Sequence, residues 1–435
     1  MAEIHPFNGI RYNTNKAQLL SSVICPPYDV ISPKQQEELY NRDAHNFVRI
    51  EYGKQNPGDT DSDSRYTRAE AYLEQWLAEG LLTADTALSM YIDDHYFMHN
   101  GCEMKRRSLM ARIRLEGWHR MVVRPHECTL VGPKSDRISL IRAIKANTSP
   151  ILSMYEDKHH AVGRILERVT ELGPLMRVDA LDGERHDIWA ITGAADLHEI
   201  ITVFEDKPLY IADGHHRYES ALVYQREQMA LYPDSGPKSA FNFVMMTMVP
   251  FDEPGLLILP THRLLRGLSR AKLTALKSEL ALFFDIKPLC SSGVDTWNVI
   301  DEWQSAEQRP HLVLFGLDGE NFMLLSLRDV EAATKFMPSF HSDVYKKLDV
   351  SLVDHIILEE LMHIQPENEM GLSFNHDRID AVQAVRTGEY QLAFIVQAVS
   401  PETIQAISDA SDRMPRKSTY FYPKQPSGLI VNRLI

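Results

Sequence analysis

The stretch of sequence that decides the fold runs from 207 to 222 and reads KPLYIADGHHRYESAL. Its apolar residues 209–212 predict a short buried strand, and Asp213-Gly214 predicts a sharp turn. The composition of 216–228 then predicts a helix. A strand, a glycine turn and a helix start together form an anion site. The first N–H groups of a helix are unpaired, and the helix dipole is positive at that end.

Cationic or hydrogen-bond-donating side chains, those of His215, His216 and Arg217, occupy the first turn of this predicted helix. Cations are unfavourable at a helix start, so an anion bound there would account for them. Gly214 allows the backbone to approach a phosphate closely. The alternative is an ordinary turn, in which Asp213 caps the helix and the histidines are surface residues. We favour the anion site and predict that Gly214, His216 and Arg217 bind a phosphate or a nucleotide.

Size and charge exclude several classes of protein. At about 100–200 residues per domain, the 435 residues allow two to four domains. The chain has 46 Lys and Arg against 60 Asp and Glu, a net charge of −14 that disfavours nucleic acid as a partner. It contains neither an apolar run long enough for a membrane span nor a secretory signal pattern. We therefore expect a cytoplasmic protein whose four separated cysteines are free thiols.

Turn signals and helical periodicity organise the rest of the chain. Asn100-Gly101, Asp182-Gly183 and Asp318-Gly319 each lie between apolar runs, which predicts three hairpins. Helices are expected at 65–79, 159–172, 194–205, 216–231, 269–283 and 345–362. Hairpins mixed with helices indicate an α+β fold with mixed, largely antiparallel sheets. We divide the chain into 1–235, which contains a hairpin insertion, and an α+β part, 236–435, whose tail folds back to the site.

The run ADGHHRY resembles the phosphate-binding signature of the ParB/sulfiredoxin-like superfamily, and its closest likeness there is the DGHHR motif of the free serine kinases. The whole chain resembles the family called domain of unknown function 1015. The supporting runs are CPPYDVIS (25–32), RPHECT (124–129), KSDR (134–137), ANTSPI (146–151), LPTHR (259–263) and KSTYFYPKQPSGL (417–429). The resemblance implies a ParB/sulfiredoxin-like nucleotide-binding core within 1–235. It also implies a small-molecule kinase that uses ATP or ADP, with free L-serine as the favoured acceptor.

Two prolines stiffen the run CPPYDVIS, and Ser32 with Pro33 predicts a helix start directly after it. Asp29 is therefore presented at a definite angle. It either hydrogen-bonds its own turn or acts as a general base. The free serine kinases place their catalytic carboxylate upstream of the DGHHR turn, and Asp29 best resembles it, although those kinases use a glutamate in a different local sequence. We assign catalytic roles to Asp29, Asp213 and His215, with Asp213 also holding Mg²⁺.

Two further segments offer cations to a phosphorylated or carboxylated ligand. The segment 124–137 is either a salt-bridged surface or an anion site; in the second case Arg124, His126, Glu127 and Arg137 bind the substrate. The tail at 417–429 interleaves aromatic residues with lysines, and its aromatic rings either clamp an adenine or pack the terminus. We predict that Lys417 and Lys424 contact phosphate.

Two other functions remain open. The first is a non-catalytic nucleotide-binding regulator on a ParB-like scaffold, which would bind nucleotide without acceptor-dependent transfer. The second is a metal-dependent hydrolase using Asp213, His215, His216 and His126, which is disfavoured because adjacent histidines at a helix start point in different directions. The expected partners are a nucleotide and a small hydroxylated metabolite, with no membrane and no nucleic acid. A homodimer is compatible with this interpretation.

Overall fold

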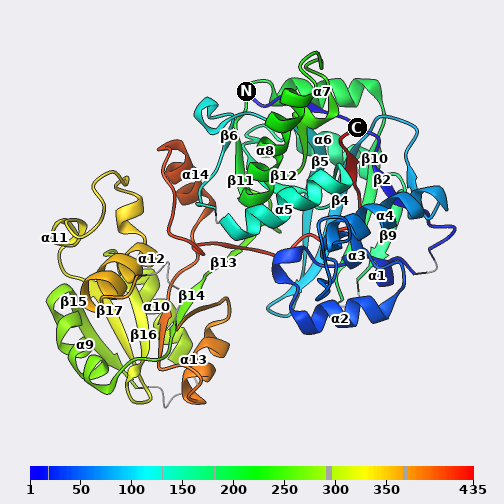
Figure 1. The fold of residues 1–435 in the computed structure, drawn as a ribbon. Helices are drawn as coiled ribbons and strands as arrows, with labels where there is room; N and C mark the ends of the chain where they lie inside the picture. Colours follow the sequence, from blue (N-terminus) through cyan, green and yellow to red (C-terminus); the bar gives the residue numbers. More distant parts are fainter. Residues whose placement is uncertain (18, 130, 181–182, 291–295, 366–370) are drawn as a thin grey trace. The chain divides into compact units, whose positions relative to one another are not determined.

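The computed structural model describes residues 1–435 except 18, 130, 181–182, 291–295 and 366–370 (Figure 1). The chain forms two compact units. The first consists of 1–125, 129–257 and 423–435, and the second consists of 126–128 and 258–422. The chain therefore leaves the first unit near Leu257 and returns to it at Pro423. The sequence placed the boundary near 235. The first unit continues past that point because the strand that follows pairs in the middle of its sheet.

A nine-stranded sheet forms the centre of the first unit, in the order β6-β11-β8-β12-β5-β4-β10-β9 with β1 on the side of β5. Its strands are β1 (Ile4–His5), β4 (Met90–His99), β5 (Cys102–Arg114), β6 (Val123–Arg124), β8 (Ile151–Tyr155), β9 (Met176–Asp179), β10 (Arg185–Ile191), β11 (Leu209–Asp213) and β12 (Phe243–Pro250). The pairs β6–β11 and β8–β12 are parallel and the other pairs are antiparallel. The mixed, largely antiparallel α+β fold is thus confirmed.

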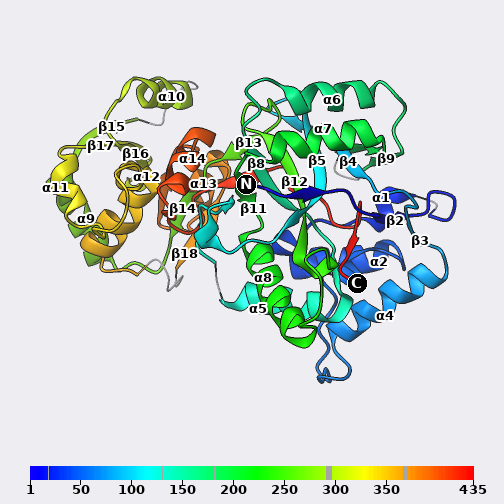
Figure 2. The same cartoon turned by 90° about the horizontal axis from the view of Figure 1, so that it is seen from above.

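Helices cover one face of this sheet. Apolar side chains of α5 (Val131–Ile144), α6 (Ala161–Thr170), α7 (Ala194–Phe204) and α8 (His215–Leu231) pack on Ile92, Leu109, Ala111 and Met246. Figure 2 shows α6 and α7 running side by side above the strands. The opposite face carries Tyr91, Met110, Ile188 and Met245 and is covered by chain ends, including Phe7, Leu429 and Ile430. The C-terminal tail is therefore part of the core of the first unit.

A second cluster of apolar side chains joins the N-terminal helices to the tail. It includes side chains of α1 (Leu20–Val23), α2 (Pro33–Arg42), α3 (Val48–Glu51), α4 (Arg65–Ala78), the paired strands β2 (Ile10–Tyr12) and β3 (Leu82–Ala84), and β7 (Ala146–Asn147). The tail contributes Val431, directly before β21 (Asn432–Arg433), which pairs with β7. The short 3₁₀ turns of this unit are Tyr28–Val30, Trp118–Arg120 and Ala240–Asn242.

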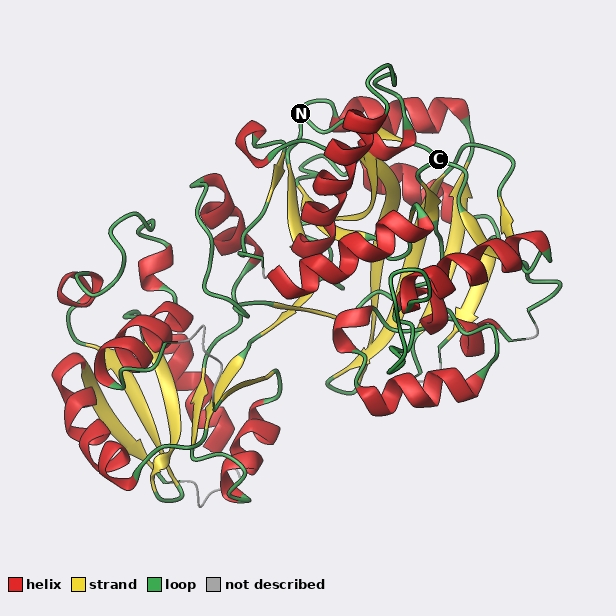
Figure 3. Cartoon of the chain, viewed as in Figure 1, coloured by secondary structure: helices red, strands yellow, loops and turns green. Residues whose placement is uncertain are grey.

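The second unit is built on a six-stranded sheet in the order β15-β17-β16-β19-β14-β18. Its strands, together with two short ones, are β13 (Leu257–Leu259), β14 (His262–Leu265), β15 (Phe284–Leu289), β16 (His311–Asp318), β17 (Asn321–Leu327), β18 (Leu372–Asn375), β19 (Leu392–Ile395) and β20 (Tyr420–Tyr422). Its helices are α9 (Arg270–Phe283), α10 (Thr296–Ala306), α11 (Val330–Thr334), α12 (Asp349–Ser351), α13 (Arg378–Arg386) and α14 (Pro401–Asp409), with a 3₁₀ turn at Tyr345–Lys347 and a π-helix at Leu352–Leu361. Figure 3 shows the helices that flank this sheet. No described helix is both long and apolar enough to cross a membrane.

Most local predictions are confirmed. β4 and β5 form the first hairpin, and Asn100 and Gly101 both have positive φ, at 49° and 77°. This is the backbone that a two-residue turn needs. β9 with β10 and β16 with β17 form the other two hairpins; the second turn includes residues 181–182, which lie outside the described residues. The helix predicted at 65–79 is α4, with Ser64 capping it.

A buried arginine holds together distant parts of the second unit. The Arg263 side chain is fully buried, and its nearest carboxylate is Asp354, whose Oδ1 lies 3.4 Å from Nε. Its Nη1 donates to the carbonyl oxygens of Thr261 at 2.7 Å and of Lys417 at 3.2 Å, and its Nη2 donates to the carbonyl of Arg416 at 3.3 Å. The arginine thereby fixes residues 416–417 beside the start of β14.

Arg263→Met should lower the free energy of unfolding of the second unit by about 3–5 kcal/mol, because it leaves the buried Asp354 carboxylate without its partner. The double variant Arg263→Met/Asp354→Leu should recover much of the loss. Scanning calorimetry measures both, with Arg386→Met in the exposed Arg386–Glu320 pair as the control that changes by less than about 1 kcal/mol. A double variant that is less stable than the single one would contradict this account.

Candidate functional site

The predicted strand, turn and helix are present as β11, Gly214 and α8. β11 has a bulge at Ala212, after which Asp213 pairs with Leu152 of β8. A bulge redirects the side chain that follows it, and here it sets the direction of the Asp213 carboxylate. Gly214 has φ 101°, and a Cβ atom there would lie 2.9 Å from Nε of Arg217. Only glycine fits this turn.

The Asp213 carboxylate lies between two cations. Its Oδ2 accepts a hydrogen bond from Nη2 of Arg217 at 2.5 Å, and its Oδ1 pairs with the ammonium group of Lys424 from the returning tail. Nη1 of Arg217 also donates to the carbonyl of Pro150 at 2.5 Å and to Oγ of Ser149 at 3.2 Å. We call Asp213, Arg217 and Lys424 the ion triad. It carries one net positive charge at the start of α8.

The ion triad keeps Asp213 ionised. Burial alone raises the pKa of this carboxyl, but the charges of Lys424 and Arg217 outweigh burial and hold the pKa well below its usual range. His215, which is buried at the first position of α8, adds a smaller effect in the same direction. His216 is half-buried beside it. The region therefore combines positive charge with the positive end of a helix dipole, as an anion site requires.

Asp29 lies in the short 3₁₀ turn Tyr28–Val30, and its side chain is exposed. Directly after the turn, Oγ of Ser32 accepts a hydrogen bond from N of Gln35 at 3.2 Å, with Pro33 as the first residue of α2. The predicted helix cap is confirmed. An exposed carboxylate on a stiffly held turn is free to meet a ligand.

Arg137 packs against this turn. Its guanidinium lies 3.8 Å from the centre of the Tyr28 ring. Burial raises the pKa of Tyr28, and the charges of Arg137, Asp29, Arg217 and Asp213 all act on that phenol. The ion triad therefore lies near the turn that carries Asp29, within the first unit.

The structure places the predicted substrate arginines in packed positions. Arg137 is buried; its Nη1 donates to Oε1 of Glu51 at 3.0 Å, and its Nε donates to Oδ2 of Asp136 at 2.7 Å. Arg124 is half-buried at the end of β6 and donates to the hydroxyl of Tyr210 at 2.9 Å. Each arginine thus has an internal partner with which a ligand would compete.

The predicted residues His126, Glu127 and Lys417 belong to the second unit, where 126–127 contacts the tail at 417–419. Nε2 of His126 lies 3.0 Å from Oγ1 of Thr419, and Oε1 of Glu127 accepts a hydrogen bond from N of Lys417 at 2.9 Å. Of the two predicted tail lysines, Lys424 is therefore the one that reaches the DGHHR turn within its own unit.

Sequence reasoning missed a layer of polar side chains on the sheet face that the tail covers. Asp93 accepts hydrogen bonds from Nδ1 of His186 at 2.9 Å and from Nε2 of Gln425 at 3.1 Å. Arg106 and His95 complete the layer from β5 and β4. The charge of Arg106 acts on Asp93 and Asp213 alike, so the layer lies near the ion triad. The signal that could have revealed this layer is the spacing of Asp93 and His95, which lie two positions apart in a predicted strand and therefore face the same side.

Ligand atoms of His95, Glu184 and His186 lie within 4.8 Å of one another and could hold a metal ion. Arg106 donates to Nδ1 of His95 at 3.2 Å, and arginine only donates. Nε2 of His95 therefore carries the proton and donates to Oε2 of Glu184 at 2.7 Å. A ring with both nitrogens occupied has no lone pair for a metal. The group fits a hydrogen-bonded chain better than a metal centre.

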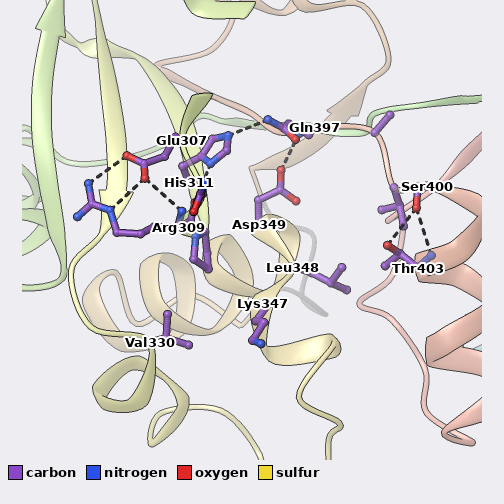
Figure 4. Close-up of a pocket in the computed structure, with 14 residues that line it drawn as sticks. Glu307, Arg309, His311, Val330, Lys347, Leu348, Asp349, Gln397, Ser400 and Thr403 are labelled. Atoms are coloured by element: carbon purple, nitrogen blue, oxygen red, sulfur yellow. Dashed lines mark hydrogen bonds and ion pairs between the residues drawn. The ribbon is translucent and has the colours of Figure 1, made fainter. Parts of the chain in front are cut away.

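A cavity of about 620 Å³ lies in the second unit (Figure 4). Its charged side chains are largely paired: Glu307 bonds Arg309, and Oδ2 of Asp349 accepts a hydrogen bond from N of Gln397 at 2.6 Å. Burial raises the pKa of Asp349. No residue predicted to form the site is among the described residues that line this cavity, and its balanced charges favour no class of ligand.

Residues 4–351 match the family described as "Protein of unknown function (DUF1015)". The chain belongs to this family. The predicted family resemblance is therefore confirmed. No curated protein matches the chain.

Several solved structures match this chain, at low sequence identity and low TM-score. A conserved hypothetical protein from Pyrococcus furiosus is 14% identical, with 74% of this chain and 95% of that chain covered and a TM-score of 0.35. A free serine kinase in complex with AMP is 13% identical, with 72% and 86% covered and a TM-score of 0.35. SbnI from Staphylococcus aureus, with a C-terminal truncation, is 14% identical, with 74% and 87% covered and a TM-score of 0.35.

Asp213→Asn should lower the free energy of unfolding by about 1–3 kcal/mol at pH 7, because it removes the charge that pairs with Lys424 and Arg217. The folded pKa of Asp213 lies below the unfolded value of about 3.9. The carboxylate therefore stabilises the fold above that pH, and the effect is lost as the pH falls below it. Urea unfolding at pH 7, 5 and 3.5 should show the wild-type advantage shrink only at the lowest pH. Asp29→Asn, at an exposed position, is the control and should change stability by less than about 0.5 kcal/mol.

Proposed function

We propose that the chain is a phosphotransferase that moves a phosphoryl group from ATP or ADP to the hydroxyl of a small metabolite, with free L-serine as the favoured acceptor. The observation that carries the proposal is the ion triad at the start of α8, formed by Lys424 and by Asp213 and Arg217 of the DGHHR run, which resembles that of the free serine kinases. Phosphoryl transfer needs neutralisation of phosphate charge, positioning of the acceptor and a group that takes up the hydroxyl proton.

The chain supplies each of these from its own residues. Arg217, Lys424 and the N-terminus of α8, with its positive dipole end, would bind the phosphates, with the His215 and His216 side chains beside them. Asp29 would take the proton from the acceptor hydroxyl as its oxygen bonds to phosphorus and the bond from phosphorus to the departing nucleotide breaks. The products are the phosphate ester and the nucleotide shortened by one phosphate.

Magnesium normally accompanies nucleotide phosphates. Asp213 was predicted to hold it, but each carboxylate oxygen of Asp213 faces a cation, Lys424 on one side and Arg217 on the other. This arrangement does not fit a direct Mg²⁺ ligand. We therefore assign Asp213 to organising the two cations.

A nucleotide-binding regulator remains the alternative, since the same triad would bind nucleotide without transfer. Incubation of the protein with Mg²⁺, ATP or ADP and a panel of hydroxylated metabolites, followed by mass spectrometry, separates the two. A phosphorylated acceptor supports the transferase, whereas nucleotide binding without any product supports the regulator. The cytoplasmic location and the homodimer stay predictions.

Arg217→Ala should weaken nucleotide binding about 10- to 100-fold, because it removes a charged hydrogen-bond donor worth about 1.5–3 kcal/mol. Calorimetric titration with ADP measures the change. Arg168→Ala is the matched control and should bind ADP like the wild type, because Arg168 of α6 forms an exposed pair with Asp196 of α7. If a folded Arg217→Ala protein bound ADP with wild-type affinity, the ion triad would not be part of the nucleotide site.

Asp29→Asn should lower turnover about 10²- to 10⁴-fold, the usual effect of losing a general base. Nucleotide affinity should stay nearly unchanged, since the ion triad is untouched. Initial rates with saturating ATP or ADP, together with an ADP titration, test both parts. If the variant keeps its turnover, another carboxylate is the base; if it loses ADP binding, Asp29 serves the nucleotide site instead.

A further inference from the structure

The returning tail is fastened to the sheet of the first unit at Gln425, the residue directly after Lys424 of the ion triad. Nε2 of Gln425 donates a hydrogen bond to Oδ2 of Asp93 at 3.1 Å. Asp93 lies on β4, between β5 and β10 in the interior of the sheet, and its side chain is buried. Lys424 pairs with Asp213 of β11. Two consecutive tail residues therefore bind two different strands of one sheet.

The backbone around these two residues is stiff. Residues 423–426 read PKQP, so a proline stands on each side of Lys424 and Gln425. Proline fixes its own φ and restricts the residue before it to extended backbone. Directly after this run, Ser427 exchanges two backbone hydrogen bonds with Cys25, at 2.8 and 3.3 Å. A displacement of Gln425 therefore moves Lys424 as well, because few rotations between them can absorb it.

Asp93 is itself held from within the sheet. Its Oδ1 accepts a hydrogen bond from Nδ1 of His186 at 2.9 Å, and His186 is fully buried. The ring of His186 lies against that of His95, with the ring centres 3.9 Å apart. The charge of Arg106 also acts on Asp93. Oδ1 of Asp93 is thus bonded from the sheet and Oδ2 from the tail, so the carboxylate is a fixed point to which the tail attaches.

This hydrogen bond also fixes the register of the tail. Further along, Leu429 and Ile430 pack among the apolar side chains of the same sheet face. A slip by one residue would bring Pro426 to Asp93, and a proline side chain has no donor to offer. A buried carboxylate oxygen that loses its donor is unfavourable. The bond therefore determines the position from which Lys424 reaches the ion triad.

We propose that Gln425 is a positioning residue of the nucleotide site, whose hydrogen bond to Asp93 holds the Lys424 ammonium group where it can meet a phosphate. The inference rests on the proposed function and deepens it, since it states how one cation of that site is held in place. A lysine side chain is long and flexible, so its ammonium group is placed only as firmly as its backbone. A misplacement of about 1 Å in such a site can cost about 10²-fold in its function.

The test is a double-mutant cycle in the full chain, with ADP affinity measured by calorimetric titration. It compares the wild type, Gln425→Met, Lys424→Met and the double variant; methionine removes the donors of both side chains and keeps most of their length. Gln425→Met should weaken ADP binding about 5- to 10-fold, because Lys424 is then held less firmly. In the Lys424→Met background the same change should alter ADP affinity by less than about 2-fold, because Gln425 acts through Lys424.

Leu429→Ala is the matched control, since it loosens the packing of the same tail but leaves Gln425 and Lys424 unchanged. It should lower the midpoint of urea unfolding while ADP affinity changes by less than about 2-fold. A purely structural role of Gln425 predicts two losses that multiply in the double variant. That result, or wild-type ADP affinity in folded Gln425→Met, would overturn the proposal.

Exchanging donor and acceptor provides a rescue. Asp93→Asn can keep its oxygen toward His186 and present an amide N–H to the tail, and Gln425→Glu places a carboxylate opposite it. The combined variant re-forms the hydrogen bond in the reverse direction. Each single variant should weaken ADP binding, and the combined one should return to within about 3-fold of the wild type. If Lys424→Met does not fold, this exchange decides; a combined variant that binds ADP no better than the single ones would contradict the proposal.

The outcomes separate this inference from the proposed function. A wild-type chain that does not bind ADP would contradict both. Loss of ADP binding in Lys424→Met but not in Gln425→Met would support the nucleotide site and contradict the positioning role. The expected cycle and rescue without any phosphoryl transfer would support the positioning role and contradict the transferase.

Discussion

The pairing of Asp213 with Arg217 and Lys424 is the interaction on which the rest of the first unit depends. Each member comes from a different part of the chain: the bulged end of β11, the first turn of α8 and the tail that returns from the second unit. Arg217 extends the connection to the carbonyl of Pro150, and so to the strand that pairs with β11. Since a buried charge without a partner is strongly unfavourable, none of these segments can leave its place alone. The ion triad thus determines where the tail runs and, through it, which polar groups on the sheet are covered.

The sequence predicted features that depend on neighbouring residues. Asn100-Gly101 predicts its hairpin because both residues accept positive φ, and Ser32-Pro33 predicts a helix start because the cap lies within three residues of the group it bonds. The sequence did not predict that Lys424 would meet Asp213, since the two are 211 positions apart and an ion pair leaves no local pattern. The division near 235 was limited in the same way, since the first unit extends to Leu257 and this depends on contacts between distant residues. The chain from 243 to 250 is a strand by its composition, but only its partners β5 and β8 show which unit it joins.

Arg137 shows why a candidate site residue cannot be judged by its type. In sequence it was one cation in a segment crowded with both signs, and a substrate carboxylate was its expected partner. In the fold it is buried against Glu51, Asp136 and the Tyr28 ring. It packs against the turn that carries Asp29, and a ligand would have to compete with these internal partners. Asp93, His95 and His186 show the opposite situation. In sequence they are polar residues of ordinary strands, but in the fold they form a connected polar network.

The pKa values of two carboxylates near Arg217, half-buried Asp213 and buried Glu51, are shifted in opposite directions. Asp213 is bonded by two cations at once, and their charges hold its pKa low although burial acts to raise it. Glu51 is buried at least as deeply but has a single close cation, Arg137, which Asp136 also binds; burial therefore prevails and raises its pKa. Two neighbouring acids thus have pKa values shifted in opposite directions by their surroundings, which is common where buried charges cluster. The ionised Asp213 carboxylate suits the fixed task of orienting Arg217 and Lys424.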